Sequence, residues 1–205
     1  MPKVSDNHKL ARREQILSAA VKCFISKGFH LCTMQDICRE AQLSPGAVYS
    51  YFTSKDEIIQ SMSEASIGQQ EALFAEIDVQ NGSVLDALMH VKTFYFNQLT
   101  ENPDAKECIR MDIMLLAEGF TDSKIKQKYQ HNLAGLINKM SGLIELGKTN
   151  GEVKTEVDAR SAAQALYALH HGLSVQLLLD QAVDMTSYHQ VLDSMINSLF
   201  VNTVS

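Results

Sequence analysis

The stretch "TMQDICREAQLSPGAVYSYFTSKDEII", residues 33–59, decides how this chain folds. Thr33 followed three residues later by Asp36 is a variant of the capping box, a pair of residues that begins a helix. The apolar residues that come next recur at helical spacing and share one inward face: Met34, Ile37, Cys38 and Ala41. The pattern predicts a helix that ends in a turn at residues 42–43.

A second, shorter helix is predicted after this turn, over residues 45–52. Ser44 is suited to be its N-cap, and Pro45 occupies the first helical position, where a missing N–H group costs nothing. Val48 and Phe52 lie four residues apart and can both face the preceding helices. The remaining side chains point partly or wholly outward: Ala47, Tyr49, Ser50 and Tyr51. Two helices joined by a tight turn, the second short and polar outside, match a helix-turn-helix.

The rest of the chain predicts further helices and no sheet. Only three prolines and ten glycines interrupt 205 residues, and alternating runs rich in Val, Ile and Thr are absent. One helix is expected over residues 7–27, with Gly28 as its left-handed C-cap, and another from Ser54 to about residue 77. Five more are expected to open at Ser83, Asn102-Pro103, Thr121, Asp158 and Ser187, giving an all-α chain of about nine helices.

Charge divides the chain into two parts. The net charge is −6, but residues 1–60 hold eight Lys and Arg against six Asp and Glu, and residues 61–205 hold ten against eighteen. A mildly basic head on an acidic body suggests that only the head faces phosphate. Four cysteines form no CxxC pair and no secretory leader is evident, so a reduced, cytoplasmic protein is expected. The uncharged run 161–179 contains His, Gln and Ser, which favours a buried interface helix over a membrane span.

The short second helix is suited to duplex DNA. Small residues at its start, Gly46 and Ala47, allow the backbone to approach base edges, and the hydroxyls of Tyr49 and Tyr51 can reach phosphate oxygens. Lys55 follows one turn later and can contact the backbone as a point charge. A capped surface helix with half-buried tyrosines is the alternative interpretation.

Residues 33–59 closely resemble the amino-terminal DNA-binding domain of the tetracycline-repressor (TetR) family of bacterial regulators. The matching features are Thr33, Ile37, Ala41, Gly46 and the run from Val48 to Lys55. The segment "ILSAAVKCFISKGF", residues 16–29, resembles the family's first helix, and the specific match covers about residues 10–65.

The resemblance implies a helix-turn-helix DNA-binding domain over residues 1–54 and a helical ligand-binding and dimerisation domain over residues 55–205. Two copies would read the half-sites of a palindromic double-stranded operator. Gln35 and Ser50 are the candidates for base edges, and a basic tail (Lys3, Lys9, Arg12 and Arg13) either adds backbone contacts or is a solvated end. The residues that the resemblance places at DNA are Thr33, Gln35, Ser44, Pro45, Gly46, Ala47, Tyr49, Ser50, Tyr51 and Lys55.

The last two predicted helices are more apolar than one buried face requires. A stripe of small residues runs along residues 161–179, and an apolar stripe runs along the final helix. Pairing both helices across a two-fold axis gives a four-helix homodimer interface, with a monomeric bundle as the alternative. The predicted interface residues are Ala165, Ala168, Gly172, Leu192, Met195 and Leu199.

The middle helices carry many Met and aromatic side chains, which line adaptable pockets for lipophilic ligands but also fill ordinary cores. The family resemblance favours a pocket for a small lipophilic or aromatic effector. The candidate pocket residues are Met89, Phe94, Phe96, Met111, Met114, Phe120, Tyr167 and His170.

No enzyme, metal or cofactor motif is found. A nucleophile elbow, a phosphate loop and an HExxH sequence are all missing. His170 and the adjacent His171 diverge by about 100° on a helix and cannot easily share a metal, and Cys32 and Cys38 have no further ligand nearby in sequence. The resemblance to the TetR family therefore implies a repressor that a small effector releases from DNA. An activator or non-inducible regulator of the same fold, and a helical enzyme or carrier with a vestigial helix-turn-helix, are the alternatives.

Overall fold

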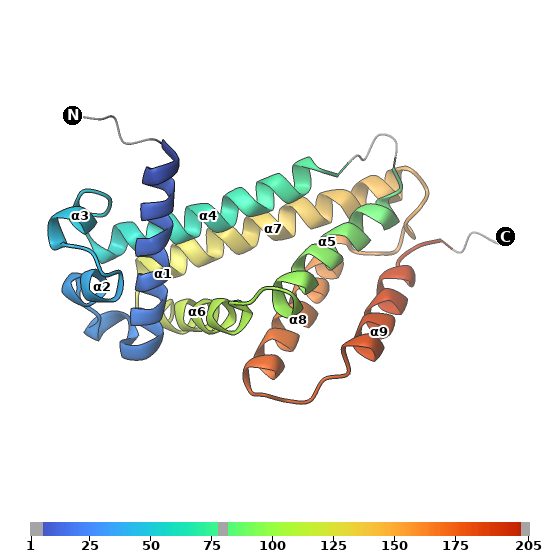
Figure 1. Ribbon diagram of the computed structural model, residues 1–205. Coiled ribbons are helices and arrows are strands. Elements are labelled where there is room, and N and C mark those ends of the chain that lie inside the picture. The colour runs from blue at the N-terminus through green and yellow to red at the C-terminus, as the bar shows by residue number, and fades with distance from the viewer. Residues whose placement is uncertain (1–5, 78–81, 202–205) are drawn as a thin grey trace. The chain divides into compact units, whose positions relative to one another are not determined.

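A computed structural model describes residues 6–77 and 82–201, which form nine α-helices and no strand longer than an isolated bridge (Figure 1). The predicted all-α fold is therefore confirmed. The helices are α1 (Asp6–Leu31), α2 (Met34–Glu40), α3 (Pro45–Tyr49), α4 (Lys55–Ala75), α5 (Val84–Thr100), α6 (Ala105–Glu118), α7 (Ser123–Thr149), α8 (Ala159–Leu178) and α9 (Met185–Asn197).

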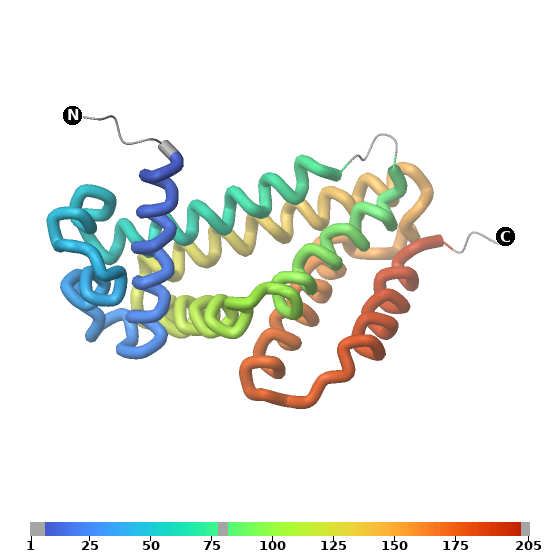
Figure 2. The backbone as a smooth tube through the Cα atoms, in the orientation of Figure 1, coloured from blue at the N-terminus to red at the C-terminus, as the bar shows by residue number. Residues whose placement is uncertain are grey.

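The chain divides into two compact units. The first comprises Met1–Ile67 and Arg110–Lys126, and the second comprises Gly68–Ile109 and Gln127–Ser205. The first unit contains α1, α2 and α3, whose path can be followed through the blue part of the tube in Figure 2. Helices α4, α6 and α7 contribute residues to both units. Among the described helices, none is long and apolar enough to cross a membrane.

The first unit has its own apolar core. Ile16, Phe24 and Phe52 are fully buried there, and Met111 of α6 joins them. The Arg13 guanidinium lies 4.8 Å from the centre of the Phe52 ring and donates to the buried Ser61 hydroxyl at 2.6 Å. Arg13 thus ties α1 to α4 and to the end of the α3 segment, in addition to the apolar packing.

Helix α1 is interrupted at the predicted glycine. Gly28 has φ of 77°, a conformation that a side chain disfavours, so regular helix ends there and one further turn leads to Leu31. The predicted break at Gly28 is confirmed, but its ψ of 163° is not that of the expected left-handed C-cap, and the helical segment continues four residues beyond the expected end at residue 27.

Most predicted helix starts are confirmed. Thr33, Ser44, Ser83 and Asp158 are the N-caps of α2, α3, α5 and α8, and the Ser54 hydroxyl accepts from the Glu57 N–H at the start of α4.

Two predicted starts are wrong, at α7 and α9. The Asp122 carboxylate, rather than Thr121, accepts the first N–H groups of α7, and Asp184, rather than Ser187, caps α9. A carboxylate accepts two N–H groups at once and its charge is favourable at a helix N-terminus, so it prevails over a neighbouring hydroxyl.

Three predicted boundaries also shift. Helix α3 ends at Tyr49 rather than residue 52, and α6 begins at Ala105 rather than at residues 102–103. Helix α9 ends at Asn197 rather than about residue 201, because the chain after it pairs instead with residues 152–154: the Val201 N–H donates to the Glu152 carbonyl, and Val153 bridges Phe200.

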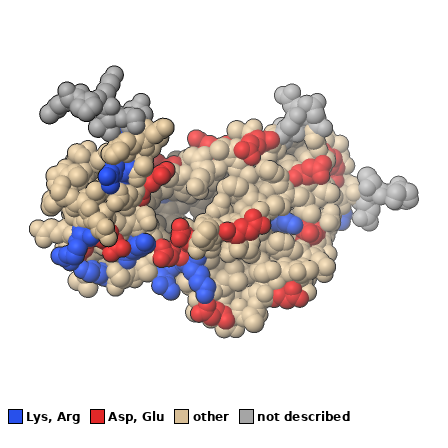
Figure 3. Space-filling model, in the orientation of Figure 1, with Lys and Arg blue, Asp and Glu red and all other residues tan. Residues whose placement is uncertain are grey.

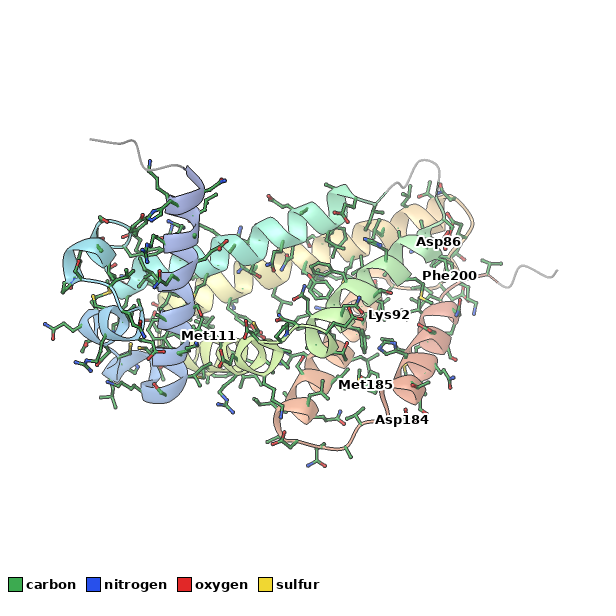
Figure 4. The ribbon with its side chains drawn as sticks, in the orientation of Figure 1. Asp86, Lys92, Met111, Asp184, Met185 and Phe200 are labelled. Atoms are coloured by element: carbon green, nitrogen blue, oxygen red, sulfur yellow. The ribbon has the colours of Figure 1, made fainter. Side chains whose placement is uncertain are left out.

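The core of the second unit is built by α5, α7, α8 and α9. Leu88, Phe96, Ile144, Leu173 and Ile196 are among its most completely buried side chains. Lys92 of α5, labelled in Figure 4, donates to Asp193 of α9 at 2.5 Å, and its side chain is only 11% exposed. The charge pair adds a specific contact between α5 and α9 to their apolar packing.

Candidate functional site

A hydrogen-bonded turn fixes α3 against α2. The Leu43 N–H donates to the Cys38 carbonyl at 3.0 Å and the Gln42 N–H donates to the Arg39 carbonyl at 3.1 Å, the two bonds of a Schellman motif. Gln42 takes the left-handed position with φ of 54°, which glycine usually occupies. Leu43 packs on the first unit's core together with Cys38, so the turn is held on its apolar side as well.

The start of α2 is held by one carboxylate. Asp36 accepts from the Thr33 N–H at 3.0 Å and from the Lys27 ammonium at 2.7 Å. Lys27, together with the Thr33 groups, keeps the pKa of Asp36 well below its usual range, so this carboxylate is ionised at neutral pH. The ion pair joins the end of α1 to the start of α2.

Helix α3 separates a buried side from an exposed side. Val48 and Phe52, just after the helix, are fully buried, whereas Tyr49 is 46% exposed. At Gly46 nothing lies within 4 Å of the position that a Cβ would occupy. The exposed side therefore combines an open backbone position with a phenolic hydroxyl.

The other residues predicted to face DNA divide into two groups. Thr33, Gln35, Ser44, Pro45 and Ser50 are exposed alongside Gly46 and Tyr49. Three are half-buried: Ala47, Tyr51, which packs on the first unit's core, and Lys55.

Two of these side chains, Lys55 and Ser50, already form hydrogen bonds within the first unit. The Lys55 ammonium donates to the Phe29 carbonyl at 2.6 Å, which leaves two of its three N–H groups for other partners. The Ser50 hydroxyl donates to the Ala47 carbonyl at 2.7 Å, and its lone pairs stay available as acceptors.

The predicted basic tail has partners of its own. Arg12 donates to Gln15 at 2.7 Å and Arg13 holds Ser61, while Lys3 lies outside the described residues. On the face drawn in Figure 3, several Lys and Arg side chains gather at the lower left, whereas Asp and Glu side chains are spread over much of the rest of the view.

The structure does not bring all the predicted pocket residues together. Phe96 is buried in the second unit's core, with Met89, Phe94 and Tyr167 packed against that core and His170 against the Phe96 ring. Met111, labelled in Figure 4, and Met114 instead pack in the first unit's core. Phe120 is 82% exposed.

His170 is held among aromatic rings in the second unit. Its ring lies 5.4 Å from that of Tyr95 and 6.2 Å from that of Phe96, and its Nε2 is 3.3 Å from the Tyr95 carbonyl oxygen. A carbonyl only accepts, so Nε2 carries the proton. Burial lowers the pKa of His170 to about 4, and the ring is neutral at pH 7.

The neutral state of His170 predicts a dependence of stability on pH. The folded-state pKa, about 4, is below the ordinary value of 6.5, so the stability contribution is complete above that ordinary value and is lost as the pH falls toward the folded value. We expect the free energy of unfolding to fall by about 2 kcal/mol more between pH 7 and 5 in wild type than in His170→Gln, which keeps an N–H donor. Urea unfolding at both pH values measures this.

The matched control is His131→Gln, at an exposed position on α7. It should keep the pH dependence of the wild type. Equal pH dependence in wild type and His170→Gln would contradict the neutral, buried state of His170.

Tyr95 and Tyr129 belong to the Met and aromatic side chains of the middle helices but were not among the candidate pocket residues. The hydroxyls of Tyr129 on α7 and Tyr167 on α8 lie 3.0 Å apart, and the buried hydroxyl of Tyr95 has no hydrogen-bond partner. Helical spacing gives a direction for each side chain but no measure of whether its hydroxyl is paired, so the sequence did not show which of these hydroxyls has a partner.

Some of the predicted dimer residues are exposed and others are buried within the chain. Ala165, Ala168 and Gly172 are exposed on α8, and Met195 is 46% exposed on α9. Leu192 is buried in the second unit's own core, and Leu199 is half-buried against it. Two further apolar side chains are also exposed: Leu179, directly after α8, at 65% and Val191 on α9 at 57%.

The fold is shared with solved bacterial regulators. GusR of Salmonella enterica aligns with a TM-score of 0.74 at 22% identity, covering 97% of this chain and 98% of that one. The regulator FadR of Bacillus subtilis, solved in complex with stearoyl-CoA, aligns with a TM-score of 0.73 at 23% identity over 90% and 97% of the two chains. In sequence, the fatty acid metabolism regulator protein of Bacillus subtilis strain 168 is 22% identical over 187 residues, 90% of this chain and 94% of that protein.

Family models match both parts of the chain. Residues 16–62, which include the turn between α2 and α3, match the model of bacterial regulatory proteins of the TetR family. Residues 87–201, more than half of the chain, match the C-terminal model of BetI-type transcriptional repressors. The chain therefore belongs to the TetR family of bacterial transcriptional regulators.

Proposed function

We propose that this regulator is a repressor that binds a palindromic operator as a homodimer in the cytoplasm and leaves it when a small lipophilic effector binds the second unit. DNA binding is supported by one observation: residues 46–52, the α3 segment, have a buried side and an exposed side. Val48 and Phe52 anchor it in the core, while Gly46 and Tyr49 are open to solvent.

Contact with DNA would begin at the α3 backbone. With no side chain at Gly46, the start of α3 can approach base edges in the major groove, and the Tyr49 hydroxyl can donate to a phosphate oxygen. Gln35, exposed in the first turn of α2, offers an amide that can pair bidentately with adenine. Phosphate contacts set affinity and salt dependence, whereas the amide would set sequence preference.

The role of Gln35 predicts a change in specificity. We expect Gln35→Ala to relax preference at one base pair of each half-site by roughly tenfold, because one bidentate contact discriminates by about 1–3 kcal/mol. Binding selection from a randomised operator library, compared with that of the wild type, measures the preference. Tyr49→Ala is the companion variant and should weaken binding to all sequences alike. An unchanged base preference in Gln35→Ala would contradict the assignment.

Assembly and release would use the second unit. The exposed small residues Ala165, Ala168 and Gly172 allow α8 of two copies to approach closely, and a two-fold axis would present two α3 segments to half-sites about 34 Å apart. An effector that binds the non-DNA-binding conformation better would shift the population away from operator by its difference in affinity. The stearoyl-CoA in the complex of FadR supports a lipophilic effector.

A gel-shift titration with the DNA upstream of the gene tests the proposal. A salt-sensitive, sequence-selective complex with two protomers is expected, and binding that does not distinguish this DNA from an unrelated fragment would contradict it.

A further inference from the structure

The Tyr95 hydroxyl is a buried polar group without a hydrogen-bond partner, which is rare in folded proteins. It is buried on α5 and forms no hydrogen bond within the described part of the chain. A buried hydroxyl without a partner loses its bonds to water and gains nothing in return. A partner that binds this position would recover that loss, so the hydroxyl marks a place where an additional molecule can gain affinity.

The surroundings of Tyr95 define what such a molecule can be. The Phe94 ring stands edge-on 5.3 Å from the Tyr95 ring, and the centre of the neutral His170 ring lies 5.4 Å from that of Tyr95. Burial, with a smaller contribution from Tyr167, raises the pKa of Tyr95 to about 12, so the hydroxyl keeps its proton and is a donor. Tyr167 is hydrogen-bonded to Tyr129. These neighbours of Tyr95 are thus an apolar ring, a neutral imidazole and neutral phenols.

An uncharged ligand suits this setting better than an ion. A carboxylate or ammonium placed here would lose its hydration and meet no opposite charge among these rings and phenols, which is costly in an apolar interior. A hydrocarbon would bury its apolar surface but leave the hydroxyl unpaired. A lipophilic molecule with a neutral acceptor oxygen satisfies both requirements.

We propose that the Tyr95 hydroxyl donates to the carbonyl oxygen of an uncharged lipophilic effector, such as a ketone or ester, bound beside the Tyr129–Tyr167 pair. The inference rests on the proposed function, because it names the chemical class of the molecule that would release the regulator. A single buried water bonded to Tyr95 is the competing occupant.

A matched pair of probes isolates the carbonyl. We would titrate the full-length protein with 2-hexanoylnaphthalene and with 2-hexylnaphthalene, and follow naphthalene fluorescence. Wild type should bind the ketone roughly tenfold more tightly than the hydrocarbon, the effect of one hydrogen bond to an otherwise unpaired donor. Tyr95→Phe should bind the two probes equally, and its melting temperature without a probe should be unchanged or higher, since an unpaired polar group has been removed.

Tyr188→Phe is the matched control. Its hydroxyl donates to the Leu169 carbonyl at 2.9 Å in the same unit, so its loss should lower the melting temperature while the preference for the ketone remains. Three results overturn the proposal: equal binding of both probes by wild type, retention of the preference in Tyr95→Phe, or no binding of either probe. A lower melting temperature of Tyr95→Phe with an unchanged preference would identify the occupant as water.

Operator binding is measured separately on each of these proteins. If the wild type binds operator normally but does not prefer the ketone, the proposed effector class is refuted and the proposed function is not. Failure of the wild type to bind operator selectively would refute the proposed function whatever the probes show.

Discussion

Gly46→Glu should abolish operator binding while leaving the fold of the chain intact. The position that a Cβ would occupy has no neighbour within 4 Å and lies in the first turn of α3, where a negative charge is favourable to a helix. The same charge would face the phosphate backbone of a docked duplex, and like charges brought together in an interface cost several kcal/mol. We expect operator affinity to fall by at least about 100-fold, with an unchanged thermal unfolding midpoint.

The matched control carries the same substitution away from α3. Gly142 on α7 is exposed and likewise has no neighbour within 4 Å of its Cβ position. Gly142→Glu changes the net charge equally, so its operator affinity, measured by fluorescence anisotropy at the same salt concentration, reports the general charge effect. If both variants lost affinity equally, the α3 surface would not be the DNA contact.

Much of the fold was predictable because short local signals are decisive in it. The capping box at Thr33, the proline that follows Ser44 and the break at Gly28 each act through backbone geometry within a few residues. The errors at α7 and α9 arose where a hydroxyl and a carboxylate both stood near a helix start. Spacing does not distinguish such neighbours, and the structure shows the carboxylate accepting the N–H groups.

The interior of the second unit was less predictable from the sequence. Met111 and Phe96 are both apolar residues on amphipathic helices, yet one packs in the first unit's core and the other in the second. Periodicity shows which face of a helix is apolar, but not which neighbouring element covers that face. Whether the Tyr95 hydroxyl has a hydrogen-bond partner is harder still to predict from the sequence, because it depends on the positions of all its neighbours.

Periodicity also does not show which apolar residues of α8 and α9 remain on the surface for contact with a second copy. Leu192 and Met195 belong to one apolar stripe in sequence, but the fold buries the first and leaves the second 46% exposed. Residues that one chain leaves exposed are available to a partner, and the exposure of the small residues of α8 around Ala168 supports the proposed contact there.

If the proposed homodimer forms through α8, Ala168→Glu should convert it to monomers without unfolding them. The side chain is exposed within one chain, so glutamate there meets solvent and the monomer is unaffected. In a close α8–α8 contact the same carboxylate would be buried opposite its own copy, and an unpaired buried charge costs several kcal/mol. Sedimentation should show a monomer at micromolar concentration, with the helical circular dichroism of the wild type.

Operator binding should fail together with dimerisation, although the first unit is unchanged. A dimer binds its second half-site intramolecularly, and losing this linkage lowers affinity by roughly 100-fold to 10,000-fold without removing any contact to DNA. Ala134→Glu, at an exposed position on α7, is the control and should remain dimeric and bind operator normally. A monomeric Ala168→Glu that binds full operator as tightly as the wild type would show that the two half-sites are read independently, whereas an unaltered dimer would place the interface elsewhere on the chain.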